Sequence, residues 1–272
     1  MTNRFSIKDK VIVVTGATGV LGHTFITALG EEGAIVGVLG RNEKVANERV
    51  KEITDKGGRA IALIADVLNE EQLIAAKDLL LKEFGRVDGL INAAGGNMPD
   101  ATVQPGEDVF NLKVDSVRKV MDLNLFGTVL PTQIFGDTIV KTAGRGSIIN
   151  ISSVSAHKAM TRVLGYSLAK TSIESYTKWF AVELANRYQD KLRINALVPG
   201  FFLAEQNRRL LTNEDGSYTD RGNKVIQQTP FKRFGDPEEL NGALIWLLSD
   251  ASAFVNGASI VVDGGFTVFS GV

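Results

Sequence analysis

Short apolar runs rich in β-branched residues alternate with longer segments of helical period along the whole chain. The runs predict seven strands, at Val11–Val14, Ala34–Val38, Ile61–Ile64, Gly89–Ile91, Ser147–Ile151, Arg193–Val198 and Ser259–Val262. The periodic segments predict helices near Leu21–Glu32, Glu43–Asp55, Glu70–Glu83, Ser116–Thr142, Tyr166–Arg187 and Pro237–Leu248. Strands that are apolar at nearly every position are typical of a parallel sheet covered on both faces. The pattern therefore predicts the α/β class, with a doubly wound, mostly parallel sheet and helices on both faces.

The domain organisation follows from what interrupts this alternation. No linker rich in proline or serine and no repeat divides the 272 residues, so we expect a single domain over 1–272. One stretch, 201–228, is polar, charged and weakly periodic. Segments of this length that leave a compact domain are often lids or binding loops, so we expect this excursion to lie over a substrate site.

Composition and charge narrow the classes of partner. A formal net charge of −1 favours neither nucleic acid nor an anionic membrane surface. The chain has no cysteine and only two histidines, His23 and His157, which excludes thiolate and histidine-rich metal centres. The N-terminal segment lacks the apolar core of a signal peptide, and no apolar run approaches the roughly 20 residues of a membrane-spanning helix. We therefore expect a soluble, cytoplasmic protein without a bound metal.

A glycine-rich loop, TGATGVLG over residues 15–22, directly follows the first predicted strand. Glycines allow the tight turn and close backbone approach by which the next helix directs its N-terminal amides at a pyrophosphate. An ordinary strand-to-helix turn has a similar composition, but the place of this loop after the first strand favours a nucleotide and hence a Rossmann-type sheet. The residues expected to contact the nucleotide here are Gly16, Thr18, Gly19, Val20, Leu21 and Gly22.

The end of the second predicted strand bears on the choice between NAD and NADP. NAD-binding units usually carry an acidic residue about 20 residues beyond the glycine loop, where it binds the ribose 2′-hydroxyl. This chain has Arg41 at the end of that strand instead. A guanidinium matches a 2′-phosphate, which favours NADP; a solvated arginine at the start of a helix would give the same pattern, so NAD stays open.

A tyrosine and a lysine, Tyr166 and Lys170, stand four residues apart in a predicted helix and so share one face. A nearby cation lowers a tyrosine pKa, as a general acid/base near neutrality requires. Such pairs are common on helices without any function. Ser153, however, lies just beyond the strand Ser147–Ile151, at the edge where open sheets bind ligands, and its hydroxyl can polarise a substrate carbonyl.

With these residues the chain resembles the short-chain dehydrogenase/reductase family over essentially its full length. The matching segments occur in the family's order: the glycine loop, Asp66-Val67, Asn92-Ala93-Ala94-Gly95, Asn124, Ser153, Tyr166, Lys170 and Pro199-Gly200. The resemblance implies an NAD(P)-dependent oxidoreductase, commonly assembled as a homotetramer or homodimer.

The resemblance also implies a role for each matching residue. Tyr166 would donate or accept the proton, Ser153 would orient the substrate oxygen, and Lys170 would lower the tyrosine pKa and bind the nicotinamide ribose. Asn124 would hold a water-linked proton path to Lys170. The other implied cofactor contacts are Asp66 and Val67 at the adenine, Asn92 and Ala94 at the adenosine ribose, and Pro199.

Two positions depart from the family's usual pattern. Val20 replaces a glycine, so that the spacing of Gly16, Gly19 and Gly22 resembles the longer, epimerase-type branch, whereas chain length matches the shorter one. Ala204 stands where the shorter branch often has a threonine for the nicotinamide carboxamide. We expect backbone groups around Leu203 to take over that contact.

The substrate is indicated mainly by further resemblance. The segment Pro199–Arg208, with residues 95–97 and the C-terminal segment Phe266–Val272, resembles the D-mannonate oxidoreductase (fructuronate reductase) subgroup. The excursion offers groups suited to the hydroxyls and carboxylate of a sugar acid, namely Gln206, Asn207, Arg208, Arg209 and Arg221. A solvated lid is the alternative. We expect His157 at the edge of the substrate pocket, and the C-terminal segment either closing the pocket or contacting another subunit.

Other functions fit parts of the pattern. A reductase of another ketone or of a 3-oxoacyl substrate would use the same machinery, although the polar excursion suits an acyl tail poorly. The glycine spacing alone suggests an epimerase or dehydratase. A catalytically idle NAD(P)-binding protein would have no need of Asn124, Ser153, Tyr166 and Lys170 together.

Overall fold

All seven predicted strands form, and they join in one sheet in the computed structural model, which describes residues 3–203, 208 and 210–271. The strands are β1 (Val11–Thr15), β2 (Ile35–Gly40), β3 (Arg59–Ile64), β4 (Gly89–Asn92), β5 (Gly146–Ile151), β6 (Leu192–Pro199) and β7 (Ser259–Val262). Their order is β3-β2-β1-β4-β5-β6-β7, and every neighbouring pair is parallel, so the sheet is parallel throughout. Strands β2 and β3 extend the sheet on one side of β1, whereas β4 to β7 extend it on the other side. The point between β1 and β4 is therefore the switch point, where open α/β sheets bind ligands.

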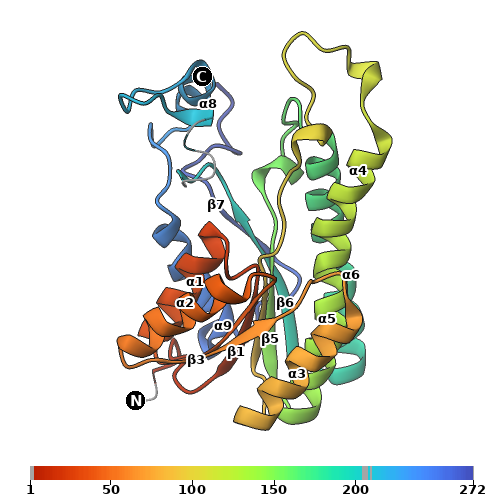
Figure 1. The fold of residues 1–272 in the computed structure, drawn as a ribbon, viewed down its shortest axis with the longest axis vertical. Coiled ribbons are helices and arrows are strands. Elements are labelled where there is room, and N and C mark those ends of the chain that lie inside the picture. The colour runs from red at the N-terminus through yellow and green to blue at the C-terminus, as the bar shows by residue number, and fades with distance from the viewer. Residues whose placement is uncertain (1–2, 204–207, 209, 272) are drawn as a thin grey trace.

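Helices cover both faces of this sheet (Figure 1). One layer contains α1 (Val20–Glu31), α2 (Glu43–Asp55) and α9 (Asn241–Leu248), and the other contains α3 (Glu70–Phe84), α4 (Val114–Met121), α5 (Gly127–Thr142) and α6 (Leu164–Tyr188). Two apolar clusters fill the spaces between sheet and helices, one on each side. Burial of these two clusters holds the strand ends in register, because removing apolar surface from water is the main stabilising term.

Local sequence signals place the helix ends. Asn42 and Asn69 precede α2 and α3, and each side chain accepts a hydrogen bond from a backbone amide in the first turn. Gly85 ends α3 in the left-handed conformation, at φ 72°, which glycine adopts without a steric penalty. These caps lie within two residues of the predicted helix boundaries because asparagine and glycine at such positions are strong local signals.

The first turn of the predicted helix Pro237–Leu248 is a 3₁₀ turn, Pro237–Leu240, and the structure differs from the predicted elements in two further places. The predicted helix Ser116–Thr142 is interrupted by a π-helical turn at Asp122–Phe126, where the Asn124 side chain bonds the Val120 carbonyl oxygen. The polar excursion contains a helix, α8 (Asp220–Gln228), which its weak periodicity did not predict. Few of its residues are buried, but Val225 packs with Leu211 and Phe234 in a small separate cluster that anchors the excursion.

The outer surface of α6 combines charged and apolar side chains. Lys178 and Arg187 are exposed, and so are Leu168, Trp179 and Val182. None of the helices in the described parts of the chain is both long and apolar enough to cross a membrane.

Candidate active site

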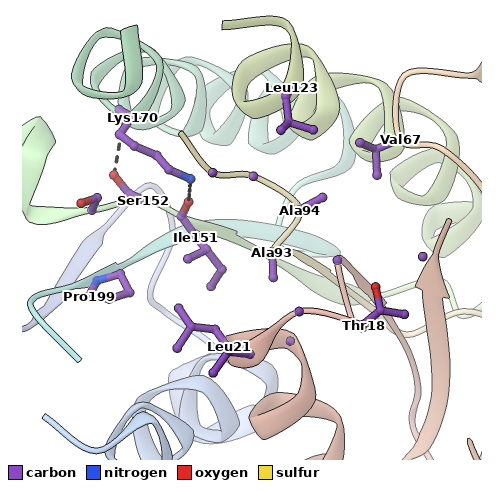
Figure 2. A pocket seen from close by; sticks show the side chains of 18 of the residues that line it. Thr18, Leu21, Val67, Ala93, Ala94, Leu123, Ile151, Ser152, Lys170 and Pro199 are labelled. Carbon is purple, nitrogen blue, oxygen red and sulfur yellow. Dashed lines mark hydrogen bonds between the residues drawn. The ribbon is translucent and has the colours of Figure 1, made fainter. Parts of the chain in front are cut away.

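A cleft of about 480 Å³ runs along the carboxyl ends of the strands at the switch point. Figure 2 shows Thr18 and Leu21 of the glycine loop on one wall and Lys170 of α6 facing them from the other. The cleft brings together most of the residues predicted to form the site: Gly16, Thr18, Gly19, Val20, Leu21, Gly22, Arg41, Asp66, Val67, Ala94, Ser153, Tyr166, Lys170 and Pro199.

The glycine loop shapes one end of the cleft. Gly16 has φ +65°, and a Cβ atom there would lie 2.7 Å from the Cα atom of Ala94. A Cβ atom on Gly22 would collide with the Gly16 carbonyl oxygen, so α1 can begin this close to β1 only with glycine at that position. In the described structure no side chain caps the N-terminus of α1, whose amides and dipole therefore favour an anion.

Ser153, Tyr166 and Lys170 meet at the other end. The Ser153 side chain acts on the Tyr166 hydroxyl so as to lower its pKa, and the Lys170 Nζ atom lies 5.4 Å from the Tyr166 ring centroid. Lys170 is buried, and its Nζ donates to the Ile151 carbonyl oxygen at the end of β5 over 2.8 Å (Figure 2). Burial lowers the pKa of Lys170 to about 8, because desolvation disfavours the charged ammonium.

The pKa of Tyr166 moves in the direction opposite to the one expected. Burial raises this pKa, and the hydrogen bond with Ser153 offsets the rise only in part. From the sequence alone, the ammonium of Lys170 is expected to lower this pKa. In the structure that ammonium is directed at the Ile151 carbonyl, and desolvation of the phenolate is the larger effect.

Asn124 lies directly behind the cleft in the π-helical turn. Its Nδ2 donates to the carbonyl oxygens of Gly96 and Val120 over 2.7 and 2.8 Å, and its Oδ1 accepts from the Gly96 amide over 3.0 Å. A Cβ atom on Gly95 would lie 2.5 Å from that Oδ1 and 3.4 Å from Lys170 Nζ. Asn124 thus fixes the loop that separates it from the lysine, and π-turns of this kind are frequent at functional sites.

Several predicted residues do not reach the cleft. The Asn92 side chain turns into the core, where it donates to Thr132 and Asn150, so it does not line the site. His157 bonds a buried carboxylate instead of facing the cleft, with 28% of its side chain exposed. Arg208 is exposed and Arg221 is half-buried, and neither lines the cleft. The remaining predicted positions, Ala204, Gln206, Asn207 and Arg209, lie outside the described residues.

The C-terminal segment packs against the loop that carries Ser153. Phe266 is buried and meets the Phe201 ring edge-on, with ring centroids 5.2 Å apart. Lys158 donates to the carbonyl oxygens of Phe266 and Phe269 over 2.9 and 3.1 Å. The segment therefore contacts Phe201, which lines the cleft.

Three residues near the site were missed by sequence reasoning. Glu174 is buried four residues beyond Lys170 and bonds His157. Arg162 and Lys158 donate hydrogen bonds to backbone carbonyl oxygens of neighbouring loops. The spacing of Tyr166, Lys170 and Glu174 was a usable signal, because positions four apart on a helix share a face. Arg162 and Lys158 act through long-range contacts that no local pattern reveals.

Comparison with known proteins identifies the family. A family model described as enoyl-(acyl carrier protein) reductase matches residues 16–267. Together with this fold and cleft, the match shows that the chain belongs to the short-chain dehydrogenase/reductase family and is an NAD(P)-dependent oxidoreductase.

Relatives match over nearly the whole chain. An uncharacterized oxidoreductase of Bacillus subtilis, UxuB, is 44% identical over 98% of both chains. A protein of Haemophilus influenza with the provisional name D-mannonate oxidoreductase, solved with bound NAD, is 39% identical, with a TM-score of 0.89 over 98% of both chains. A gluconate 5-dehydrogenase of Burkholderia cenocepacia, solved with NADP and tartrate, is 31% identical, with a TM-score of 0.87 over 98% of both chains.

Proposed function

We propose that this oxidoreductase interconverts a ketone and a secondary alcohol on a sugar acid, of which D-fructuronate and D-mannonate are the leading pair. Two similar structures support this choice, one bearing the name D-mannonate oxidoreductase and one a gluconate dehydrogenase with bound tartrate. The observation that carries the proposal is an arginine on α8, Arg221, which has no hydrogen-bond or ion-pair partner within the described parts of the chain.

Arg221 stands near a second guanidinium. Burial lowers the pKa of Arg221, and the nearby charge of Arg162 lowers it further. Arg162 is itself held by hydrogen bonds to the Val103 carbonyl and the Gln104 side chain, over 2.8 and 2.6 Å. Two cations that repel one another favour an anion between them, and a guanidinium matches a carboxylate in geometry. A sugar acid supplies that carboxylate, whereas a neutral ketone does not.

The residues at the cleft suit carbonyl reduction and its reverse. Nicotinamide, when bound, supplies or accepts the hydride. Ser153 donates a hydrogen bond to the substrate oxygen, and the Tyr166 hydroxyl passes its proton to the same oxygen during reduction. Lys170 places a positive charge beside the tyrosine, which stabilises the phenolate once the proton has left. Asn124 holds the Gly95-Gly96 loop against Lys170 and supports a proton path from solvent.

The shape of the cleft fits a dinucleotide. The close packing of Gly16 and Gly22 leaves a backbone cradle at the N-terminus of α1, which would hold the pyrophosphate. Asp66 and Val67 would contact the adenine, Ala94 the adenosine ribose, and Lys170 with Pro199 the nicotinamide half.

Replacing Arg221 by methionine tests the sugar-acid proposal. We expect KM for D-fructuronate to rise about 10- to 100-fold, since a hydrogen bond between charged groups contributes about 1.5–3 kcal/mol. Steady-state assays should show no comparable change with an uncharged ketose. The matched control is Lys224→Met, which removes one exposed positive charge from the same helix. Equal KM values for the acid in wild type and R221M would contradict the proposal.

We further propose that the enzyme prefers NADP. Arg41 is 74% exposed and lies at the end of β2, beside a shallow hollow that it shares with Thr18, Asn42, Glu43 and Lys44. Its only ion-pair contact in the described structure is with Asp66, over 3.5 Å, so the guanidinium can turn to a 2′-phosphate at little cost.

The cofactor preference is tested by Arg41→Asp. We expect KM for NADPH to rise about 10-fold or more and KM for NADH to fall, because the carboxylate repels a 2′-phosphate and accepts from a 2′-hydroxyl. Initial rates with each cofactor at a fixed substrate concentration measure both effects. Lys51→Gln is the control, because Lys51 lies on α2, the helix that follows Arg41, and pairs with Asp55. An unchanged ratio of the two KM values would show that Arg41 does not contact a phosphate.

We propose one domain over 1–272 that forms a homotetramer or homodimer in the cytoplasm. The exposed apolar side chains of α6, Leu168, Trp179 and Val182, support association through that helix.

A further inference from the structure

A buried carboxylate lies outside the set of groups that the reaction requires. Glu174 is 7% exposed and sits on α6, one turn beyond Lys170 and two turns beyond Tyr166. Its Oε1 accepts from Ser152 Oγ over 2.8 Å, and its Oε2 accepts from Ser259 Oγ over 2.9 Å. His157 Nε2 lies 2.9 Å from both carboxylate oxygens. Burying an unpaired carboxylate at this depth would cost free energy of folding, and the four contacts offset that cost.

The contacts fit an ionised carboxylate that only accepts hydrogen bonds. Such a group offers about four acceptor positions, and Ser152, Ser259 and His157 can each supply a donor. In this arrangement the proton between the two groups lies on His157 Nε2, which donates to the carboxylate. A glutamine would present an NH₂ group in place of one carboxylate oxygen, so one of these donors would lose its acceptor unless a serine hydroxyl turned to accept instead.

The three donors come from elements that must stay in fixed relation during the reaction. Ser152 and His157 lie on either side of Ser153 in the loop after β5, and Ser259 begins β7. Ser152 Oγ also lies 3.4 Å from the carbonyl oxygen of Lys170 (Figure 2). Glu174 thus joins the loop that carries Ser153 to the helix that carries Tyr166 and Lys170.

We propose that Glu174 is a positioning residue, which holds the Ser153 loop against α6 so that the Ser153 and Tyr166 hydroxyls stay within hydrogen-bond reach. Misplacement of reacting groups by about 1 Å can lower the rate about 100-fold. We therefore expect the contact between the Ser153 loop and α6 to affect kcat. The inference rests on the oxidoreductase chemistry of the family and not on the choice of a sugar acid.

The first test observes the contact itself. The chain has only two histidines, so ¹⁵N spectra of the imidazole rings contain His157 and His23, and His23→Gln assigns them. We expect a protonated, slowly exchanging Nε2 on His157 in the wild-type protein, and loss of that protection in Glu174→Gln. The signal of His23, which pairs with Glu52, should not move. An unprotonated Nε2 in wild type, or identical His157 signals in both proteins, would overturn the proposal.

The second test separates positioning from stability. We expect Glu174→Gln to lower kcat about 10- to 100-fold and to leave the dissociation constant of the reduced cofactor unchanged. Thr177→Val is the matched control, because Thr177 is a buried hydrogen-bonding residue of the same helix that bonds Asn150. It should lower Tm without lowering kcat.

Two outcomes would decide against Glu174. One is a wild-type kcat in Glu174→Gln. The other is a lowered kcat in Thr177→Val, which would mean that loss of stability alone lowers kcat. Ser152→Ala, which removes a single donor, replaces Glu174→Gln if that variant does not fold, and it should lower kcat in the same direction. Absence of turnover by the wild-type enzyme with a panel of sugar acids would count against the substrate proposal alone, and the imidazole spectra would still decide the role of Glu174.

Discussion

Replacing Tyr166 by phenylalanine should lower kcat about 10²- to 10⁴-fold, the range expected when a general acid is removed. Tyr166 lines the cleft together with Ser153, and phenylalanine keeps the ring but supplies no proton. Binding of the reduced cofactor, followed by its fluorescence, should stay at the wild-type level because the ring and Lys170 remain. Steady-state assays at saturating cofactor measure the loss.

The matched control for this variant is Tyr176→Phe. Tyr176 lies on the same helix, ten residues further on, and stacks on Phe180 with ring centroids 5.1 Å apart. The variant removes a tyrosine hydroxyl from α6 at a residue that does not line the cleft. Wild-type turnover by Y166F would refute the proposed proton transfer, whereas equal losses in both variants would indicate damage to the helix.

Replacing Lys170 by methionine should lower kcat/KM about 10²-fold or more while changing how stability depends on pH. The loss of rate follows from removing a charge that stabilises the phenolate. In the folded protein burial lowers the pKa of Lys170 to about 8 from an ordinary 10.5. The unfolded chain therefore keeps its proton to higher pH than the folded chain does.

The sign of the pH effect follows from this difference. Between about pH 8 and 10.5 the unfolded chain binds more protons, so the free energy of unfolding of the wild type rises with pH across that window. The rise amounts to about 3 kcal/mol at most, from about 1.4 kcal/mol for each pKa unit. Methionine has no proton to lose, so K170M should lack this rise.

Denaturant titrations at pH 7 and at pH 10.5 measure the difference between the two proteins. The free energy of unfolding of K170M minus that of the wild type should be higher at pH 7 than at pH 10.5, by up to about 3 kcal/mol. Lys178→Met, an exposed lysine of the same helix, should show no such change. A constant difference between K170M and wild type at both pH values would mean that burial does not perturb Lys170.

The fold was predictable to the extent that local patterns record it. Strands such as β1 are buried at every position, and a continuous apolar run of that kind is visible in the sequence. The π-helical turn was not predictable, because it depends on Asn124 meeting the Gly95-Gly96 loop, a contact between segments far apart in the chain. Helix α8 escaped prediction because Val225 and Gly222 are its only buried residues.

In the candidate site, too, local patterns predicted some residues, whereas others depend on contacts between distant segments. The glycine loop, Ser153, Tyr166 and Lys170 stand at strand ends or on one helix face, and the structure brings them to one cleft. The side chain of Asn92 lies in the core and not in the cleft, because its partners are on β5 and α5, a long-range arrangement that no local pattern records. The direction of the Tyr166 pKa was also missed, since burial of a side chain depends on the whole fold.

The most direct test of the proposed function is the absorbance of reduced nicotinamide in purified enzyme given NADPH or NADH together with D-fructuronate. We predict oxidation of the cofactor, faster with NADPH, and no comparable rate with an uncharged ketose or a 3-oxoacyl substrate. Cofactor that binds but is not consumed with D-fructuronate, while another carbonyl compound is reduced, would contradict the sugar-acid proposal and leave the family's chemistry intact.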